Sequence, residues 1–322
     1  MNRLIDKAAA IPVNDAVPVV SVAPVTLSVP DRPVDLELRI SAPVEGTDLP
    51  VILLSHGMGP SLYIPSLSGY GPLADFLAAR GFAVIQPTHL NAPVYGLGAD
   101  APGAPLFWRS RATDMSAILD RFDAIEAQAP AIAGRIDRER IAAVGHSMGG
   151  QTVGMLLGAR LTDPKDGKAR DVSLAEPRIR AGVLLAAPGN GGDSLSDFAR
   201  ETYSALNPDF SSMTTPTLVV VGDADDSAYL TTRGADWHRA PYVHGPGARD
   251  LLTLVGGRHG LGGVAGYDAK ETDDEDPDRL AVTQRMVGAW LRSALYPGDP
   301  AWPEACRALA DRAGMLGAVE SK

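Results

Sequence analysis

The stretch Arg140-Ile-Ala-Ala-Val-Gly-His-Ser-Met-Gly-Gly150 decides both the fold and the chemistry that we expect. Its first six residues form a short apolar run that predicts a buried strand, and the residues from Met148 onward have the pattern of a helix. A chain that turns from strand to helix within so few residues forces Ser147 into a strained conformation and exposes its hydroxyl. Gly145 and Gly149 fit this turn, because a Cβ at either position would collide with the neighbouring strand or helix.

The rest of the chain alternates between strand and helix patterns. Two early runs alternate apolar and polar residues, as half-exposed antiparallel edge strands do, whereas six later runs are apolar throughout, as in parallel strands. The expected strands are 20–27, 34–41, 50–55, 81–86, 140–145, 180–187, 216–222 and 250–255, and the expected helices are 67–80, 108–129, 148–160, 277–295 and a piece from about 302. The pattern predicts an α/β fold: an eight-stranded, mostly parallel sheet with helices on both faces.

Two long connections interrupt this alternation. Residues 88–107 and 188–215 each follow a strand and are expected to lack regular structure. Segments of this kind in a compact domain are often active-site loops. We therefore expect a single domain over 1–322, with an N-terminal extension over 1–19 and these two loops beside the site.

Composition narrows the possible partners. The 322 residues carry a formal net charge of −10 and contain one cysteine, Cys306. An acidic chain without a basic run disfavours nucleic acid and anionic membranes, and it leaves small-molecule or polymer substrates that are neutral or apolar. One cysteine excludes a disulfide framework and a zinc site of several thiolates. No apolar run could span a membrane and residues 1–20 lack a signal-peptide core, so we expect a cytoplasmic protein.

A serine hydroxyl reacts only with a base in reach and an acid that orients the base. In enzymes with a serine on such a turn, the acid and then the histidine follow it in the sequence. His259 is the expected base, because it directly follows the strand 250–255. His238 and His244 lie in a loop that does not directly follow a strand, so no strand directs them toward the serine. We expect them to lie at the surface or in a loop that contacts the substrate. His146 is expected to pack away from the serine.

Three aspartates follow the strand 216–222 and are candidates for the acid. Asp225 is the expected one, because it lies three residues beyond the glycine that ends the strand. Asp226 is the runner-up. Asp223 is expected to hydrogen-bond backbone within the turn.

Two backbone N–H groups are needed to bind a developing oxyanion. One is expected from Met148, the residue after the nucleophile, and the other from Met58 in the turn Ser55-His-Gly-Met-Gly-Pro60. Met58 could also act as an apolar wall, and both roles are compatible. No residue pattern calls for a metal ion.

The substrate pocket is less defined by the sequence. Tyr63, Trp108 and Trp237 are the candidate pocket residues, and Arg109 or Arg111 could hold a substrate carboxylate. The alternative is that these aromatic rings pack loops onto the sheet and that the arginines pair with Asp100 or Asp114.

Two further motifs carry little weight. Gly260-Leu-Gly-Gly-Val-Ala265 matches a dinucleotide fingerprint, but no strand with a ribose-binding acid follows it. The acidic run Asp273-Asp-Glu-Asp-Pro-Asp278 is interpreted as a solvated cap for the helix that follows, and its spacing is not that of an EF-hand. We therefore expect no cofactor.

Four of these segments together resemble the α/β-hydrolase superfamily over about residues 20–296. They are His56-Gly-Met-Gly59, Gly145-His-Ser-Met-Gly-Gly150, Gly222-Asp-Ala-Asp225 and Arg258-His-Gly260. Within it, the chain looks like the branch of dienelactone hydrolases, chlorophyllases and platelet-activating-factor acetylhydrolases, and Gly145–Gly150 is also similar to bacterial cutinases and polyester hydrolases.

One departure limits what this resemblance implies. The acetylhydrolases carry their acid after the strand that follows the nucleophile, where this chain reads Leu185-Ala-Ala-Pro-Gly189. The resemblance therefore implies a cofactor-independent serine carboxylic-ester hydrolase, without lipid-mediator specificity. Acyl transfer, amide or peptide cleavage, and a non-catalytic binding protein on the same scaffold stay open as alternatives. The acyl and alcohol groups and the oligomeric state also stay open.

Overall fold

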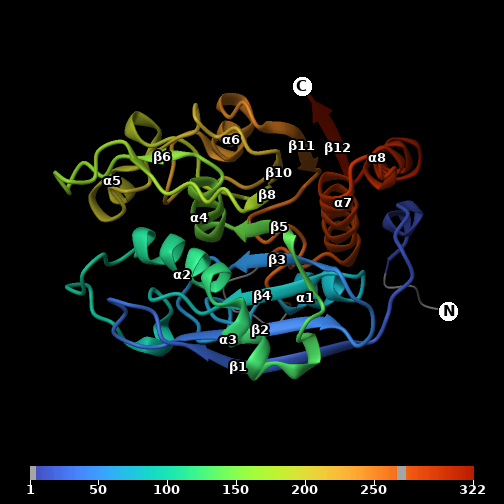
Figure 1. Cartoon of the computed structure of the whole chain (residues 1–322). Coiled ribbons are helices and arrows are strands. Elements are labelled where there is room, and N and C mark those ends of the chain that lie inside the picture. The colour runs from blue at the N-terminus through green and yellow to red at the C-terminus, as the bar shows by residue number, and fades with distance from the viewer. Residues whose placement is uncertain (1–4, 267–272) are drawn as a thin grey trace.

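One large sheet runs through the computed structural model, which describes residues 5–266 and 273–322 (Figure 1). Its central strands, from β4 to β11 in spatial order, are parallel, and the pairs β1–β2, β2–β4 and β11–β12 are antiparallel. In spatial order the nine strands are β1 (Val19–Leu27), β2 (Leu36–Pro43), β4 (Ala83–Pro87), β3 (Leu49–Ser55), β5 (Ile136–His146), β8 (Ile179–Leu185), β10 (Thr217–Gly222), β11 (Ala248–Leu254) and β12 (Gly317–Ser321).

All eight expected strands are present, but the expected number was wrong by one. The ninth strand, β12, covers the edge of β11. Both amphipathic strands were expected at an edge of the sheet. Of the two, β1 does lie at an edge, whereas β2 lies between β1 and β4. The strands β3, β4 and β10 are buried over their whole length, which explains why their sequences are apolar throughout.

A helix lies at each expected position, but the helices Asp197–Thr202 and Ala240–His244 were not expected, and several bounds differ, as for Gly71–Ala78, which is shorter than the expected 67–80. The expected helix 108–129 is two helices, because Arg121 departs from helical geometry with φ −122°. The helix after Ser147 ends earlier than expected, shortly before Gly158, which has φ +113°. The helices are α1 (Gly71–Ala78), α2 (Trp108–Asp120), α3 (Phe122–Gln128), α4 (Met148–Leu156), α5 (Asp197–Thr202), α6 (Ala240–His244), α7 (Pro277–Leu295) and α8 (Ala301–Arg312).

Several shorter elements complete the described chain. A small sheet joins three two-residue strands, and 3-10 turns lie in the connections. They are β6 (Arg160–Leu161), β7 (Val172–Ser173) and β9 (Pro208–Asp209), with η1 (Lys7–Ala10), η2 (Pro93–Tyr95), η3 (Pro130–Ile132), η4 (Gly192–Ser194) and η5 (Gly234–Arg239). Among the described residues, no helix combines the length and the apolarity needed to cross a bilayer.

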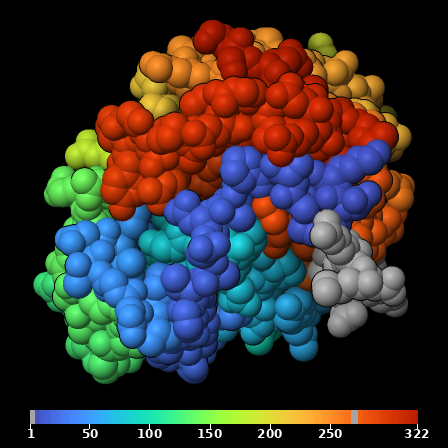
Figure 2. Space-filling model, turned by 90° about the vertical axis from the view of Figure 1, so that its right-hand side faces the viewer, coloured from blue at the N-terminus to red at the C-terminus, as the bar shows by residue number. Residues whose placement is uncertain are grey.

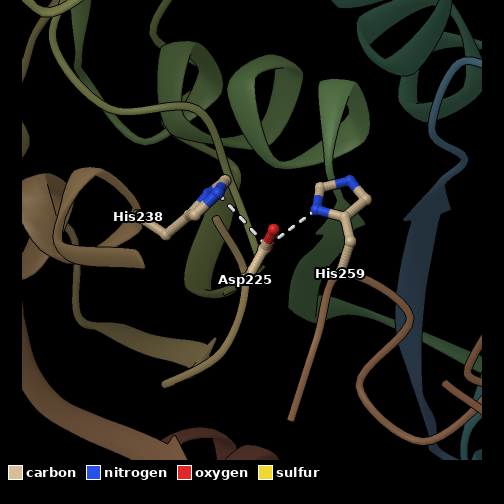
Figure 3. A group of neighbouring side chains, drawn as sticks. All are labelled: Asp225, His238 and His259. Carbon is tan, nitrogen blue, oxygen red and sulfur yellow. Dashed lines mark hydrogen bonds and ion pairs between the residues drawn. The ribbon is translucent and has the colours of Figure 1, made fainter. Parts of the chain in front are cut away.

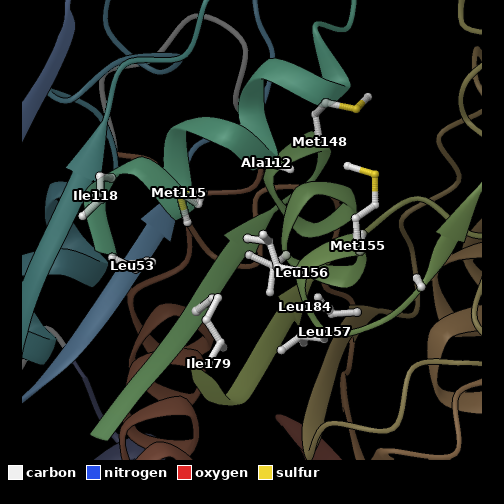
Figure 4. Close-up of a cluster of buried hydrophobic side chains, with 14 of the residues drawn as sticks. Leu53, Ala112, Met115, Ile118, Met148, Met155, Leu156, Leu157, Ile179 and Leu184 are labelled. Atoms are coloured by element: carbon white, nitrogen blue, oxygen red, sulfur yellow. The ribbon is translucent and has the colours of Figure 1, made fainter. Parts of the chain in front are cut away.

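Two apolar cores lie on opposite faces of the large sheet. The first contains buried residues of α2, α3 and α4, packed on strands such as β3 and β8 (Figure 4). The second contains residues of α1, α7 and α8. Each fully buried leucine or isoleucine contributes roughly 2 kcal/mol, so these two layers hold the central strands in register.

The N-terminal extension is part of the second core. Ala8 and Ile11 are fully buried, and η1 contacts α7 and α8. Figure 2 shows this segment lying along the C-terminal helices. Residues 1–4 of the extension lie outside the described residues.

Candidate active site

Ser147 occupies the sharp turn that the sequence predicts between β5 and α4. Its backbone has φ 54° and ψ −122°, an unfavourable conformation for a residue with a Cβ. The Ser147 N–H donates a hydrogen bond to the carbonyl of Leu185 at 2.8 Å, which fixes the turn against β8. A Cβ on Gly145 would overlap the carbonyl of Gly149, and a Cβ on Gly149 would overlap that of Ser55. The expected need for glycine at these two positions is confirmed.

Of the three candidate aspartates, Asp225 is the one that contacts His259. Its Oδ2 accepts a hydrogen bond from His259 Nδ1 at 2.7 Å. The Asp225 side chain is buried, while that of His259 is 34% exposed. Asp226 is exposed. Asp223 accepts a hydrogen bond from the backbone N–H of Gly256, which lies in the loop after β11 and not within its own turn as expected. His259 is therefore anchored at one ring nitrogen and accessible on the rest of the ring.

Ser147 and His259 line the same cavity, which has a volume of about 820 Å³. A pocket of this size can enclose a drug-sized molecule. The segment 88–107 forms much of its wall, whereas the segment 188–215 contributes Tyr203. Contrary to expectation, the second segment has regular structure, since it contains η4, α5 and β9. The lining residues are Met58, Gly59, Pro60, Ile64, Tyr70, Leu90, Asn91, Ala92, Pro93, Gly96, Leu97, Gly98, Ala99, Ala104, Pro105, Phe107, His146, Ser147, Tyr203, Tyr229, His259, Gly260, Ala265 and Asp273.

The three expected pocket residues lie elsewhere, and this prediction is corrected. Trp237 is fully buried, and its Nε1–H donates to the carbonyl of Asn190 at 2.7 Å. Trp108 is buried in the first core and borders a neighbouring cavity of about 640 Å³. Tyr63 is 44% exposed and is not among the described residues that line the cavity at Ser147. The aromatic residues that do line this cavity are Tyr70, Phe107, Tyr203 and Tyr229.

The two expected oxyanion donors lie on either side of Ser147. Met58 lines the cavity, and Met148 is the first residue of α4. Among the described residues, no acceptor is found for either backbone N–H. Gly57, just before Met58, packs so closely on the site that a Cβ there would lie 3.3 Å from the Ser147 Cβ. The turn that carries Met58 is thus in direct contact with the serine.

A chain of hydrogen bonds through Tyr70 and His146 connects this turn with the loop of His259. The Gly57 N–H donates to the Tyr70 hydroxyl at 2.9 Å, and Tyr70 lies 2.8 Å from His146 Nδ1. His146 Nε2 lies 2.7 Å from the carbonyl oxygen of His259, so it must donate there. Burial and the nearby charge of His259 lower the pKa of His146 to about 3, and its neutral ring therefore accepts the Tyr70 proton at Nδ1. His146 therefore differs from the expected residue that only packs away from the serine, because it lines the cavity with Ser147 and forms hydrogen bonds at both ring nitrogens.

Arg111 is fully buried behind the Met58 turn. It donates to Thr152 Oγ1 on α4 at 2.8 Å, to Asn91 Oδ1 in the segment 88–107, and to the carbonyl of His56. Burial lowers its pKa to about 9. Arg111 therefore does not face the cavity to hold a substrate carboxylate, but ties together three elements of the site. Arg109 is exposed, lies over the Trp108 ring and is 4.0 Å from Asp166.

A second serine–histidine–aspartate array lies beside Arg111, and we call Ser55, His89 and Asp114 the buried array. His89 Nε2 is 3.0 Å from Ser55 Oγ, and His89 Nδ1 is 2.8 Å from Asp114 Oδ2. All three residues are buried, and none of them lines a described cavity. The other Asp114 oxygen pairs with Arg32 at 3.0 Å, so its partner is not Arg109 or Arg111 as the sequence had left open.

The acidic run before α7 is only partly solvated. Asp276 caps α7 by accepting from the Arg279 N–H, as expected. Asp274, in contrast, is buried, and its Oδ2 accepts from the N–H groups of Arg258 and Gly262 at 2.8 and 3.2 Å. Its other oxygen pairs with the Arg279 side chain. Asp274 therefore fixes the loop that carries His259, and its oxygens are already engaged.

His238 overturns the expected surface or loop role, because it is fully buried and also contacts Asp225. Figure 3 shows the Asp225 carboxylate between the His238 and His259 rings. The distance from His238 Nε2 to Asp225 Oδ2 is 3.2 Å. Burial opposes ionisation of Asp225, but hydrogen bonds from both histidines hold its pKa well below its usual range. His244 is exposed, as expected.

The same three side chains could also hold a metal ion. Their ligand atoms lie within 4.8 Å of one another, and they are the one such group among the described residues. In this arrangement, however, the facing nitrogens of both histidines are engaged with the Asp225 carboxylate. A metal would have to replace both of these contacts.

No protein-family model matches the chain, and no curated protein matches it. Its function must therefore be inferred from the residues around the cavity.

Proposed function

We propose that the protein is a serine carboxylic-ester hydrolase with an α/β-hydrolase fold. One observation carries this proposal. His259, bonded to the buried Asp225, lines the same cavity as Ser147, which occupies a strained turn between strand and helix. The order of the three residues in the sequence and the mostly parallel sheet support the same conclusion.

In the proposed reaction, Ser147 Oγ attacks the ester carbonyl carbon and His259 Nε2 takes the hydroxyl proton. The C–O bond to the alcohol then breaks, and His259 returns the proton to the leaving alkoxide. Water attacks the acyl-enzyme in the same way, which releases the acid and restores Ser147. Asp225 supports both steps, because its contact with Nδ1 keeps the proton on that nitrogen and leaves Nε2 free to act as the base.

The backbone N–H groups of Met58 and Met148 are proposed to bind the oxyanion of each tetrahedral intermediate. Donors fixed in advance need no reorganisation when the charge develops, and loss of one such donor costs about 10²- to 10³-fold in rate. Arg111, Tyr70 and Asp274 support this arrangement from behind, since each bonds to backbone of the turn or loop involved.

The cavity favours a neutral or apolar ester. Its wall consists mainly of alanine, proline, glycine, leucine and aromatic residues, and Asp273 is the acidic residue among the described lining residues. The neighbouring cavity of about 640 Å³ shares Phe107 and Tyr203 with it, which offers room for the remainder of a larger ester or a polymer chain. A negatively charged substrate would meet no arginine or lysine in the described wall.

A covalent probe for activated serines tests the proposal directly. We expect a fluorophosphonate to label the wild-type protein and S55A, but not S147A, because Ser55 has no access to the cavity. With p-nitrophenyl esters of graded acyl length, S147A should lose about 10⁴-fold or more in kcat. Labelling of S147A, or its turnover at the wild-type rate, would contradict the proposal. Added alcohols or amines that capture the acyl group in preference to water would instead indicate acyl transfer.

A further inference from the structure

His56 is a buried histidine beside the Met58 turn, and the proposed reaction does not use it. It directly follows β3 and is 2% exposed. Both of its ring nitrogens face backbone groups. Nδ1 is 2.6 Å from the carbonyl oxygen of Gly57, and the backbone N–H of His89 lies 3.0 Å from Nε2. These two contacts determine which nitrogen carries the proton.

One neutral form of the His56 ring satisfies both contacts. A carbonyl oxygen can only accept, so Nδ1 must carry a proton, and a backbone N–H can only donate, so Nε2 must be bare. The opposite tautomer would set two lone pairs against each other at Gly57 and two protons at His89, which is costly for buried groups. An imidazolium would also set two protons against each other at His89. Burial and the charge of Arg111 lower the pKa of His56 well below its usual range, in agreement with a neutral ring.

The Gly57 carbonyl that accepts this proton and the Met58 N–H belong to one peptide group. The peptide bond is trans, so the N–H points away from the side on which the C=O is held. His56 lies on that side and is buried, whereas Met58 lines the cavity. The preceding peptide group is held too, because the Gly57 N–H donates to the Tyr70 hydroxyl. Side chains therefore fix both peptide groups of Gly57.

We propose that His56 is a positioning residue for the oxyanion, because its Nδ1–H bond to the Gly57 carbonyl orients the Met58 N–H and polarises the peptide group that carries it. This inference rests on the proposed function of Met58 as an oxyanion donor. A hydrogen bond to the peptide oxygen withdraws electron density from the peptide nitrogen, so the N–H becomes a stronger donor. The gain is largest when the substrate oxygen carries a full charge, and His56 therefore favours the tetrahedral intermediate over the bound ester.

His56 also has a structural contact that must be separated from this role. Through Nε2 it accepts from His89, at the start of the segment 88–107, and so ties the wall of the cavity to the Met58 turn. That contact needs an acceptor on the side chain, whereas the proposed role needs a donor at the Nδ1 position. A pair of variants that differ in this donor alone can therefore distinguish the two.

The proton position can be measured in the wild-type protein without any assay of activity. With ¹⁵N-histidine labelling, two-bond ¹H–¹⁵N correlation spectra distinguish the two neutral tautomers and the imidazolium, and the signal that is absent from H56N assigns His56. We expect a protonated Nδ1 and a bare Nε2 at neutral pH. A proton on Nε2 would overturn the inference, whether or not the protein hydrolyses any ester.

H56N and H56L form the matched pair, because asparagine and leucine have nearly the same shape and both lack an acceptor at the Nε2 position. The asparagine amide can still donate to the Gly57 carbonyl, and leucine cannot. We expect kcat of H56L to lie roughly tenfold to a hundredfold below that of H56N with a similar KM, because an oxyanion donor acts in the transition state. Equal kcat values, or a difference confined to KM, would overturn the proposed role.

A tetrahedral adduct tests the polarisation in the wild-type protein, so it does not depend on the folding of any variant. An alkylboronic acid bonds to a reactive serine and places a boron-bound oxygen where the oxyanion would lie. We expect the Met58 amide proton and the His56 Nδ1 proton both to move downfield, because the two hydrogen bonds strengthen each other. A shift at Met58 without one at His56 would overturn the polarisation. Failure of any adduct to form at Ser147 would instead contradict the proposed function itself.

Discussion

The described residues contain two serine–histidine–aspartate arrays whose histidine–aspartate hydrogen bonds are similar and whose surroundings differ. In the buried array, His89 lies 2.8 Å from Asp114, and in the cavity array (Ser147, His259 and Asp225), His259 lies 2.7 Å from Asp225. Ser55 ends the regular strand β3 and is fully buried, whereas Ser147 has a positive φ and lines a cavity. The hydrogen bond between acid and histidine therefore does not by itself distinguish the array that we propose to be reactive from the buried one.

Two physical differences do distinguish the arrays. Burial and the positive charge of Arg111 lower the pKa of His89 well below its usual range, so this ring is too weak a base to accept the Ser55 proton. The second difference is access, because a substrate can reach Ser147 and His259 through the cavity but cannot reach Ser55. The buried array instead connects Ser55, at the start of the Met58 turn, with α2. Its contribution is to hold the fold.

The sharpest test of this contrast changes the acid of each array. Asp225→Asn should lower kcat by about 10³- to 10⁴-fold, because the orienting charge on His259 is lost. Asp114→Asn should keep kcat within about tenfold but reduce the free energy of unfolding by roughly 3 kcal/mol, because Arg32 loses its buried partner. Ester turnover and urea unfolding of both variants measure these effects.

Asp226→Asn is the matched control for Asp225, since it is the next residue and is exposed. It should behave as the wild type in both measurements. If Asp114→Asn abolished ester turnover while the protein kept its normal stability, the buried array would not have a purely structural role.

The second prediction concerns how the free energy of unfolding changes at acidic pH. His56, His89 and His146 are buried, and burial lowers the pKa of each, to about 3 for His146. Below about pH 6.5 the unfolded chain binds protons at these positions that the native protein does not bind. The free energy of unfolding should therefore fall as the pH falls, by up to about 1.4 kcal/mol per pH unit for each histidine.

Asp114 opposes part of this loss. Burial raises its pKa to about 7, so the native protein takes up this proton before the unfolded chain does, and its contribution rises as the pH falls from about 7 to about 4. Three histidines outweigh one carboxyl group, and the net result is an acid-sensitive fold. Urea unfolding midpoints between about pH 8 and about pH 5 measure it, and H146Q should flatten the dependence. A midpoint that stays constant over this range would mean that the three buried histidines are not held neutral by the native fold.

The smallest expected effect comes from Arg111→Lys. A lysine ammonium cannot reach Thr152, Asn91 and the His56 carbonyl together, so the Met58 turn loses one of its supports. We expect kcat/KM to fall by roughly tenfold to a hundredfold, because small displacements of the oxyanion donors are costly. The control is Arg109→Lys, two residues away on the same helix and exposed, which should leave the kinetics unchanged. Identical kinetics in both variants would mean that Arg111 does not support the turn.

Most of the sheet could be predicted from the sequence, because buried parallel strands are continuous apolar runs. The strand β12 was missed because Gly317-Ala-Val-Glu-Ser321 is short and mostly exposed, so neither burial nor alternation marks it. The break at Arg121 was missed because no glycine or proline signals it. The sequence also could not show that β2 lies inside the sheet. An alternating pattern indicates that one face of a strand is exposed, but it does not indicate whether the strand has a neighbour on each side.

The site was predictable where a local motif defines it. Ser147, Asp225 and His259 each end or follow a strand, and parallel strands bring such positions to one edge of the sheet. The buried polar residues do not belong to such a motif, although the sequence of α2 indicates that two of its charged residues are buried. Arg111 and Asp114 occupy positions in register with the apolar Trp108, Met115 and Ile118, and a charged residue at such a position implies a buried partner. For Trp108 and Trp237 the sequence leaves open a pocket role or packing, and the structure shows packing, because the large apolar surface of tryptophan favours burial.

The short strand β12 has a consequence for the behaviour of the chain at high concentration. Without it, β11 would present a row of unpaired backbone donors and acceptors at the end of a long, apolar sheet. Such an edge is a template for intermolecular pairing and aggregation. The glutamate and serine of this otherwise modest segment, together with the bond from the Lys322 N–H to the Arg249 carbonyl, give the sheet a polar margin instead. Removal of β12 would therefore endanger solubility before it disturbed any residue at the cavity.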